Sequence, residues 1–156
     1  MQGGGWSWLA TDLPQLRTLV LSRAGQSGYH LPAALGDCTS LQVLRFEGLG
    51  HYPPPPGPYL SRLRRLDWLA CDQHEFSKTL AALTAVEELT LLFTAWEAER
   101  SIGALSTLRN LRKLTFLLHE CYRSNAADIN IVLSIQQHLP AVEVVCQLYE
   151  PAPVPI

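Results

Sequence analysis

The chain has 156 residues, enough for one domain with a full hydrophobic core and too few for two ordinary ones. Hydrophobic residues make up 47% and charged residues 17%, which argues against intrinsic disorder. The net charge of −2 lacks the basic excess of proteins that bind nucleic acid or anionic membranes, and no apolar run is long enough to span a bilayer. We therefore expect one folded domain with neither a nucleic-acid nor a membrane partner.

The first ten residues and the cysteines bear on the cellular compartment. Residues 1–10 lack the basic and apolar regions of a secretory signal, so we expect an intracellular, cytoplasmic protein, with a nuclear or axonemal location left open. The four cysteines are Cys38, Cys71, Cys121 and Cys146. None forms a Cys-x-x-Cys pair or a zinc-site spacing with histidine. In a reducing compartment we interpret them as free thiols.

A six-residue pattern recurs along the chain, consisting of an apolar residue, two variable residues, an apolar residue, one variable residue and an apolar residue. Five clear copies begin at Leu16, Leu41, Leu63, Val86 and Leu111, and a weaker sixth begins at Val142. The starts lie 22 to 31 residues apart. An apolar residue or a cysteine stands three positions ahead of each start, at Leu13, Cys38, Leu60, Leu83, Leu108 and Leu139. This spacing indicates one structural unit repeated six times.

The repeated pattern resembles the leucine-rich-repeat superfamily, and the resemblance extends from Leu13 to Leu148. The segment from His30 to Leu41 is the most similar to the connector and strand of that family. The resemblance implies an α/β solenoid with about six short parallel strands on the concave side and helices and loops on the convex side. The Asn or Cys that the family carries after the strand is matched only by Cys71, so no subclass is assigned.

The connectors between the copies predict helices behind the strands. Thr94-Ala-Trp-Glu97 has the form of a capping box that opens a helix toward Leu105. The longest connector, residues 125–139, predicts the longest helix, which we expect to close the C-terminal end of the core. The apolar residues expected on one face of that helix are Ile129, Val132, Leu133 and Leu139.

These elements divide the chain into a cover segment at residues 1–12, a repeat domain at 13–150 and a flexible proline-rich tail at 151–156. The cover at the N-terminal end consists of Trp6, Trp8 and Leu9, with Leu13 beside them. A repeat buries its apolar face only against its neighbours, so an uncovered end predicts packing within a larger array or a complex.

Charged residues at two repeat positions test the alignment of the copies. The position after the first apolar residue carries Arg64, Glu87, Arg112 and Glu143 from the third copy onward. The next position carries Arg65, Glu88, Lys113 and Val144. Stacked strands would place these residues side by side, and the alternating signs predict favourable pairs between strands. We interpret them as stabilising the sheet rather than as recognising a partner.

An apolar strip follows the last four strands and is our candidate for a partner-binding surface. Its residues are Leu69, Leu92, Phe93, Leu117, Leu118, Leu148 and Tyr149. In a regular repeat these positions lie at the concave edge and face water, and a contiguous exposed apolar strip marks an interaction site. A shifted register or a covering loop would bury them instead, and both interpretations are open at this point.

No residue set matches a catalytic, cofactor or metal site. Cys71 lies near His74, but its place after the strand favours a buried structural cysteine over an activated thiol. Asp67 faces the concave side whereas Asp72 enters the connector, so the two do not form an acid–base pair. The proline run from Tyr52 to Tyr59 is interpreted as a rigid polyproline connector rather than as a ligand for an adaptor domain.

We therefore expect a protein–protein interaction module, acting as a scaffold, adaptor or substrate-recognition domain, that binds an unidentified protein through its concave face and edge. We expect no enzymatic activity and no cofactor. Similar repeats occur in intracellular proteins of plants and algae, in F-box ubiquitin-ligase adaptors and in axonemal proteins. Two alternatives are a protein inhibitor that occludes an active site and a fragment of an F-box adaptor.

Overall fold

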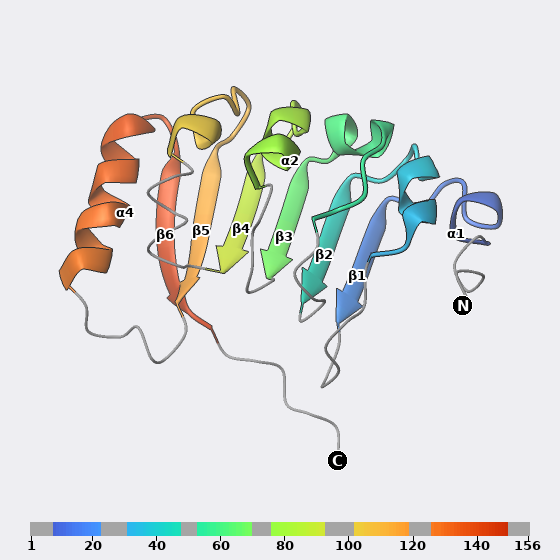
Figure 1. Ribbon diagram of the computed structural model, residues 1–156, viewed down its shortest axis with the longest axis horizontal. Coiled ribbons are helices and arrows are strands. Elements are labelled where there is room, and N and C mark those ends of the chain that lie inside the picture. Colours follow the sequence, from blue (N-terminus) through green and yellow to red (C-terminus); the bar gives the residue numbers. More distant parts are fainter. Residues whose placement is uncertain are drawn as a thin grey trace, which may run out of the picture.

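Six parallel strands form a single sheet in the computed structural model, which describes residues 8–22, 31–47, 53–69, 76–92, 102–118 and 126–149. The strands are β1 (Thr18–Ser22), β2 (Val43–Glu47), β3 (Arg65–Leu69), β4 (Glu88–Leu92), β5 (Lys113–Leu118) and β6 (Glu143–Leu148). Their order in the sheet follows their order in the chain (Figure 1). The chain is therefore an α/β protein whose sheet grows by one strand at each return of the chain.

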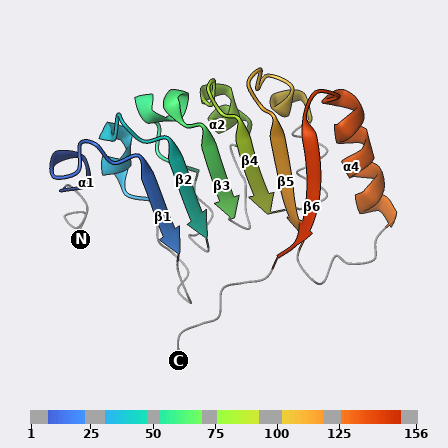
Figure 2. The same cartoon turned by 180° about the vertical axis from the view of Figure 1, so that it is seen from behind.

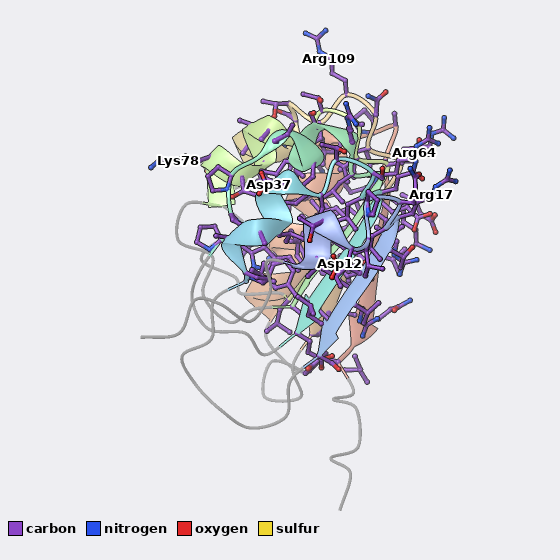
Figure 3. The ribbon with its side chains drawn as sticks, turned by 90° about the vertical axis from the view of Figure 1, so that its right-hand side faces the viewer. Asp12, Arg17, Asp37, Arg64, Lys78 and Arg109 are labelled. Atoms are coloured by element: carbon purple, nitrogen blue, oxygen red, sulfur yellow. The ribbon has the colours of Figure 1, made fainter. Side chains whose placement is uncertain are left out.

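Helical segments precede each strand and lie on one face of the sheet. They are α1 (Trp8–Thr11), η1 (Ala33–Asp37), η2 (Pro58–Arg62), α2 (Phe76–Ala82), a helical turn at 102–105 and α4 (Ala126–His138). Parallel strands need such crossovers, because every strand must start again at the same end of the sheet. Seen along the sheet, the described helices lie to one side of the strands (Figure 3). We call the other side the open face, which is turned toward the viewer in Figure 2.

The core lies between the sheet and these helices, and alternate residues of each strand build it. Two columns of inward side chains are buried, namely Leu44, Leu66, Leu89 and Leu114 in one and Phe46, Trp68, Leu91 and Phe116 in the other. The rings of Phe46 and Trp68 pack with centroids 5.8 Å apart. Each such side chain contributes about 1.5–3 kcal/mol when it leaves water, so the repeated leucines account for the stacking of the strands.

The apolar position ahead of each strand is also buried, as the repeat pattern predicts, with one exception. The buried members are Cys38, Leu60, Leu83, Leu108 and Leu139. Leu13 is 43% exposed, because it precedes the edge strand β1 and has no earlier repeat beside it. Leu9 of α1 is 1% exposed and belongs to the core, while the N-terminal cover at residues 1–12 stays a prediction. Trp6 and the side chain of Trp8 lie outside the described residues.

The register of β6 differs by one residue from the one that the sequence pattern predicts. Lys113 pairs with Glu143, whereas the pattern places Val144 beside it. Val144 instead continues the inward column of Leu114. The turn ahead of the two strands is the same, since the amide of Val142 donates to the carbonyl of Leu139 as that of Leu111 donates to the carbonyl of Leu108; β6 therefore begins to pair one residue closer to this turn than β5 does.

Helix α4 is the longest helix of the described residues, as expected, and it lies beside β6 at the C-terminal end of the sheet (Figure 1). Among its described side chains Ile135 is buried, and Ile131 and Val132 are partly buried against the core. The prediction that Leu133 shares this face is wrong, since Leu133 is 55% exposed. Two residues of helix correspond to a rotation of about 200°, so Leu133 points away from the side that carries Ile131 and Ile135.

The proline run packs against the helical side. Pro54 is buried, and the buried hydroxyl of Tyr59 donates to the carbonyl oxygen of Pro55 at 2.7 Å. Burial raises the pKa of the Tyr59 hydroxyl above its ordinary value. Within this run, Gly57 approaches Gly36 so closely that a Cβ on Gly57 would lie 2.7 Å from the Gly36 Cα. The run is thus an integral connector of the fold.

Candidate functional site

The open face presents three columns of side chains that run across the strands. The leading column consists of Thr18, Val43, Arg65, Glu88, Lys113 and Glu143. The middle column consists of Val20, Arg45, Asp67, Thr90, Thr115 and Val145. The trailing column consists of Ser22, Glu47, Leu69, Leu92, Leu117 and Gln147. Charged and hydroxyl side chains thus occupy the centre of the face, and leucines occupy its trailing edge.

Asp67 is the most buried charged residue of this face, with an exposure of 3%. Arg65, two positions earlier on the same side of β3, donates to its carboxylate from Nη2 at 3.1 Å and from Nε at 3.2 Å. Arg45, its neighbour on β2, brings Nη1 to within 4.0 Å of the same carboxylate. A buried charge is costly unless it is paired, and these two guanidinium groups provide the pairing. The hydrogen bond to Asp67 raises the pKa of the Arg65 guanidinium.

Ion pairs extend this cluster to both sides. Arg45 lies 3.8 Å from the Glu47 carboxylate, and Arg65 lies 3.5 Å from the Glu88 carboxylate on the next strand. A second pair joins Arg64 and Glu87 at 3.8 Å, just ahead of the same strands. The prediction that alternating charges pair across strands is therefore confirmed for β3 and β4. In the leading column, the corrected register continues the alternation to Glu143 beside Lys113 of β5.

A hollow of about 230 Å³ opens beside Asp67 on this face. Its walls are charged, with Arg45, Arg65, Glu88 and Lys113 around it, while Thr90 and Thr115 contribute hydroxyls. Such a surface can accept charged and polar side chains of a partner through hydrogen bonds and ion pairs. Within the described residues there is no cluster of three or more His, Cys, Asp or Glu that could hold a metal ion. None of the described helices is long and apolar enough to cross a membrane.

The apolar strip proposed from the sequence is only partly exposed. Leu69 is 3% and Leu92 is 9% exposed, so the expectation that these two face water is wrong. Leu117, Leu118 and Tyr149 are half-buried, and Leu148 is 43% exposed. The one-residue shift in β6 places Gln147 beside Leu117, while Leu148 pairs with Leu118 on the helical side. Phe93 lies outside the described residues, and a binding role for this strip stays a prediction.

Tyr149 links the two ends of the trailing edge. Its backbone amide donates to the Leu118 carbonyl at 2.8 Å, which fixes it beside β5. Its hydroxyl donates to the carboxylate of Glu47 on β2. Strands β3, β4 and β5 lie between Tyr149 and Glu47, so the two side chains meet across the trailing ends of these strands. Tyr149 follows β6, and the four strand spacings from β6 to β2 amount to about 19 Å in a flat sheet, farther than these side chains reach, so the sheet curves toward the open face.

The remaining candidate residues lie in different places. Cys38 is a buried free thiol, and Cys146 is an exposed one on the edge strand. Burial is the main cause that raises the pKa of both thiols, and the nearby Asp37 carboxylate adds to it for Cys38. Neither thiol has the lowered pKa of a nucleophilic cysteine. The other residues considered for catalysis, Cys71, Asp72 and His74, lie outside the described residues, as do Thr94 and Glu97 of the expected capping box.

Sequence reasoning placed Asp67 on the open face but missed its two arginine partners and the contact between Tyr149 and Glu47. Residues two apart on one strand share a face, so the pairing of Arg65 with Asp67 could have been found from the strand pattern. The Tyr149–Glu47 contact joins residues 102 positions apart and carries no local signal. Comparison of the chain with models of known protein families and with curated proteins finds no match.

Proposed function

We propose that this chain is a leucine-rich-repeat solenoid that works as a protein–protein interaction module and binds its partner through the open face. The observation that carries the proposal is the charged cluster around Asp67, which the described helices leave uncovered. The repeat pattern, the sequential parallel sheet and the helices on one face support the solenoid assignment.

The side chains of the open face suit recognition of a protein surface. Arg45 and Arg65 are each held by Asp67, while 43% and 47% of their side-chain surface stays exposed to a partner. Arginine groups fixed in this way lose little side-chain entropy on binding, and arginine is enriched among the residues that dominate interface energies. The alternating charges restrict which partners fit, because like charges brought together across an interface are strongly unfavourable.

The dimensions of the face indicate how a partner would bind. Six strands about 4.8 Å apart and about 17 Å long present a projected area on the order of 400 Å². A standard interface buries about 800 Å² on each partner. The partner therefore must also contact an edge of the sheet, and the exposed Leu148 beside Tyr149 offers an apolar contact there.

A bulky substitution in the hollow tests this proposal. Thr90 lines the hollow on β4, so Thr90→Trp fills the space that a partner side chain would occupy. The matched control is Lys78→Trp, because Lys78 is an exposed residue of α2 on the opposite side of the sheet (Figure 3). Each purified variant is melted and then used for quantitative affinity capture beside the wild-type protein.

We expect both variants to melt within a few degrees of the wild type. Proteins captured in stoichiometric amounts by the wild type should be retained by Lys78→Trp and lost by Thr90→Trp. If a correctly folded Thr90→Trp variant retains the same partners as the control, the open face is not the binding surface. A partner lost only by Lys78→Trp would move the site to the helical side.

A further inference from the structure

A second hollow, of about 400 Å³, lies where the chain enters the first three strands. Three arginines line it, namely Arg17, Arg62 and Arg64, and the described lining contains no carboxylate. The other polar groups of the lining include the hydroxyls of Thr39, Ser40 and Ser61. In a chain with a net charge of −2, this hollow is a local concentration of positive charge.

The backbone of the sheet fixes the spacing of two of these arginines. The amide of Gln42 donates to the carbonyl of Arg17 at 2.8 Å, and the amide of Arg64 donates to the carbonyl of Gln42 at 2.8 Å. Arg17 and Arg64 therefore occupy equivalent positions two strands apart, or about 9–10 Å. Their side chains project to the same side of the molecule, away from Asp37 and Lys78 (Figure 3). A group placed between them can be contacted by both.

Little negative charge neutralises the three arginines. Among the described residues, Arg17 has no ion-pair partner, and Arg62 donates to a neutral group, the carbonyl of Thr39, at 2.8 Å. Arg64 lies 3.8 Å from Glu87, and both side chains are well exposed, at 66% and 37%. Such a pair is worth little in water, so Arg64 can turn from Glu87 to an anionic ligand at small cost.

These groups match the chemistry of a phosphate monoester. Guanidinium groups bind phosphate oxygens through paired, charge-assisted hydrogen bonds. The hydroxyls of Thr39, Ser40 and Ser61 can donate to the remaining oxygens. A continuous polyanion fits less well, because it would run from the arginines onto Glu87 and Glu88 of the neighbouring repeat. The hollow therefore suits one isolated phosphate group rather than a nucleic acid.

We propose that this hollow binds a phosphorylated side chain of the protein partner. The proposal rests on the proposed function only for the source of the phosphate, which is the protein partner. The hollow lies at the leading ends of the strands, and the open face of these same strands receives that partner. A phosphate bound here would add a point of specificity at the edge of that face. Recognition of a phosphorylated segment by arginines is a known general mode of regulated protein binding.

The site can be tested on the isolated protein without knowing the partner. The probes are N-acetyl-O-phosphoserine amide, inorganic phosphate, the unphosphorylated serine amide and a short single-stranded oligonucleotide. Binding is followed by two-dimensional NMR of the backbone amides and arginine Nε–H groups. We expect the phosphoserine probe to shift the signals of Arg17, Gln42 and Arg64, and the unphosphorylated probe to leave them unchanged.

The test variant is Arg17→Gln combined with Arg64→Gln, and the control is Arg109→Gln plus Arg112→Gln, which removes two exposed arginines farther along the chain. We expect at least a tenfold loss of phosphoserine affinity in the test variant and less than a twofold loss in the control. If the double variant fails to fold, Arg17→Gln alone serves, because Arg17 is exposed and has no ion-pair partner in the described part of the chain. A threefold loss is then expected.

Several results would overturn the proposal. Equal affinities of the test and control variants would show that phosphate binds only through general charge. Binding of inorganic phosphate without the phosphoserine probe would assign the site to free phosphate, and tighter binding of the oligonucleotide would assign it to nucleic acid. Because no partner takes part, these results are independent of the Thr90→Trp experiment on the open face.

Discussion

Removing the Asp67 carboxylate is expected to destabilise the fold far more than removing an exposed carboxylate nearby. Asp67 is 3% exposed and accepts hydrogen bonds from Arg65 at 3.1–3.3 Å. A hydrogen bond between charged groups contributes about 1.5–3 kcal/mol. Because the side chains of Arg45 and Arg65 are about half exposed, they recover hydration when the carboxylate is lost. We therefore expect Asp67→Ala to lower the free energy of unfolding by about 2 kcal/mol.

Two further variants separate the causes of this loss. Asp67→Asn keeps the volume of the side chain, so any destabilisation that it shares with Asp67→Ala comes from the lost charge rather than from a cavity. Glu87→Ala is the matched control, because Glu87 pairs with Arg64 at 3.8 Å on the exposed surface. Its removal is expected to cost about 0.5 kcal/mol or less.

Urea denaturation followed by circular dichroism measures these differences. In a thermal melt of a chain of this size, a loss of about 2 kcal/mol in the free energy of unfolding corresponds to a fall in melting temperature of about 4–8 °C. An Asp67→Ala variant that is no less stable than Glu87→Ala would refute the reasoning, because the carboxylate would then not be a buried partner of the two arginines.

Two other predictions concern packing and can be checked by urea denaturation. Gly57→Ala should lower the free energy of unfolding by about 1–3 kcal/mol. Its Cβ would lie 2.7 Å from the Gly36 backbone, which cannot move as a flexible side chain can. The control Gly103→Ala adds a Cβ at a helical position with nothing within 4 Å, so its stability should be unchanged or rise by about 1 kcal/mol at most. Equal losses in both variants would contradict the close approach of Gly57 to Gly36. Ile135→Ala should cost about 2–5 kcal/mol, because this α4 residue is 0% exposed. Leu133→Ala, at a position 55% exposed, should change stability by about 0.5 kcal/mol or less, and the reverse order would mean that α4 packs through its other face.

The repeat pattern predicted the strands, their order along the chain and the register of the first five. Each of those copies carries large apolar residues at the two inward positions, as Leu66 and Trp68 do in β3. In β2 to β5 the residue between them is polar, so only one register buries the apolar set. The sixth copy contains Val142, Val144 and Val145, which permit two registers one residue apart. In the structure Val144 pairs with Leu114, and the six-residue pattern alone does not distinguish this register from the other.

The candidate site was less predictable because it depends on the curvature of the sheet. The pattern placed Leu69 and Leu92 on the strand edge, and a regular repeat would expose them. Curvature toward the open face brings Tyr149 to Glu47, and the two side chains meet across the trailing ends of the strands between them. Local spacing contains no information on a contact between the second strand and a residue that follows the sixth. The arginine-lined hollow was also missed, since Arg17 belongs to the first copy whereas Arg62 and Arg64 lie at the third.

Site-specific photo-crosslinking tests most directly whether the open face binds the partner. A photoreactive phenylalanine analogue replaces Lys113 on the open face in one variant and Lys78 on the helical side in another. Each protein is irradiated with its captured partners, and the adducts are identified by mass spectrometry. We predict that position 113 forms an adduct with one defined protein and that position 78 does not. An adduct at position 78 together with none at 113 would contradict the assignment of the binding surface to the open face.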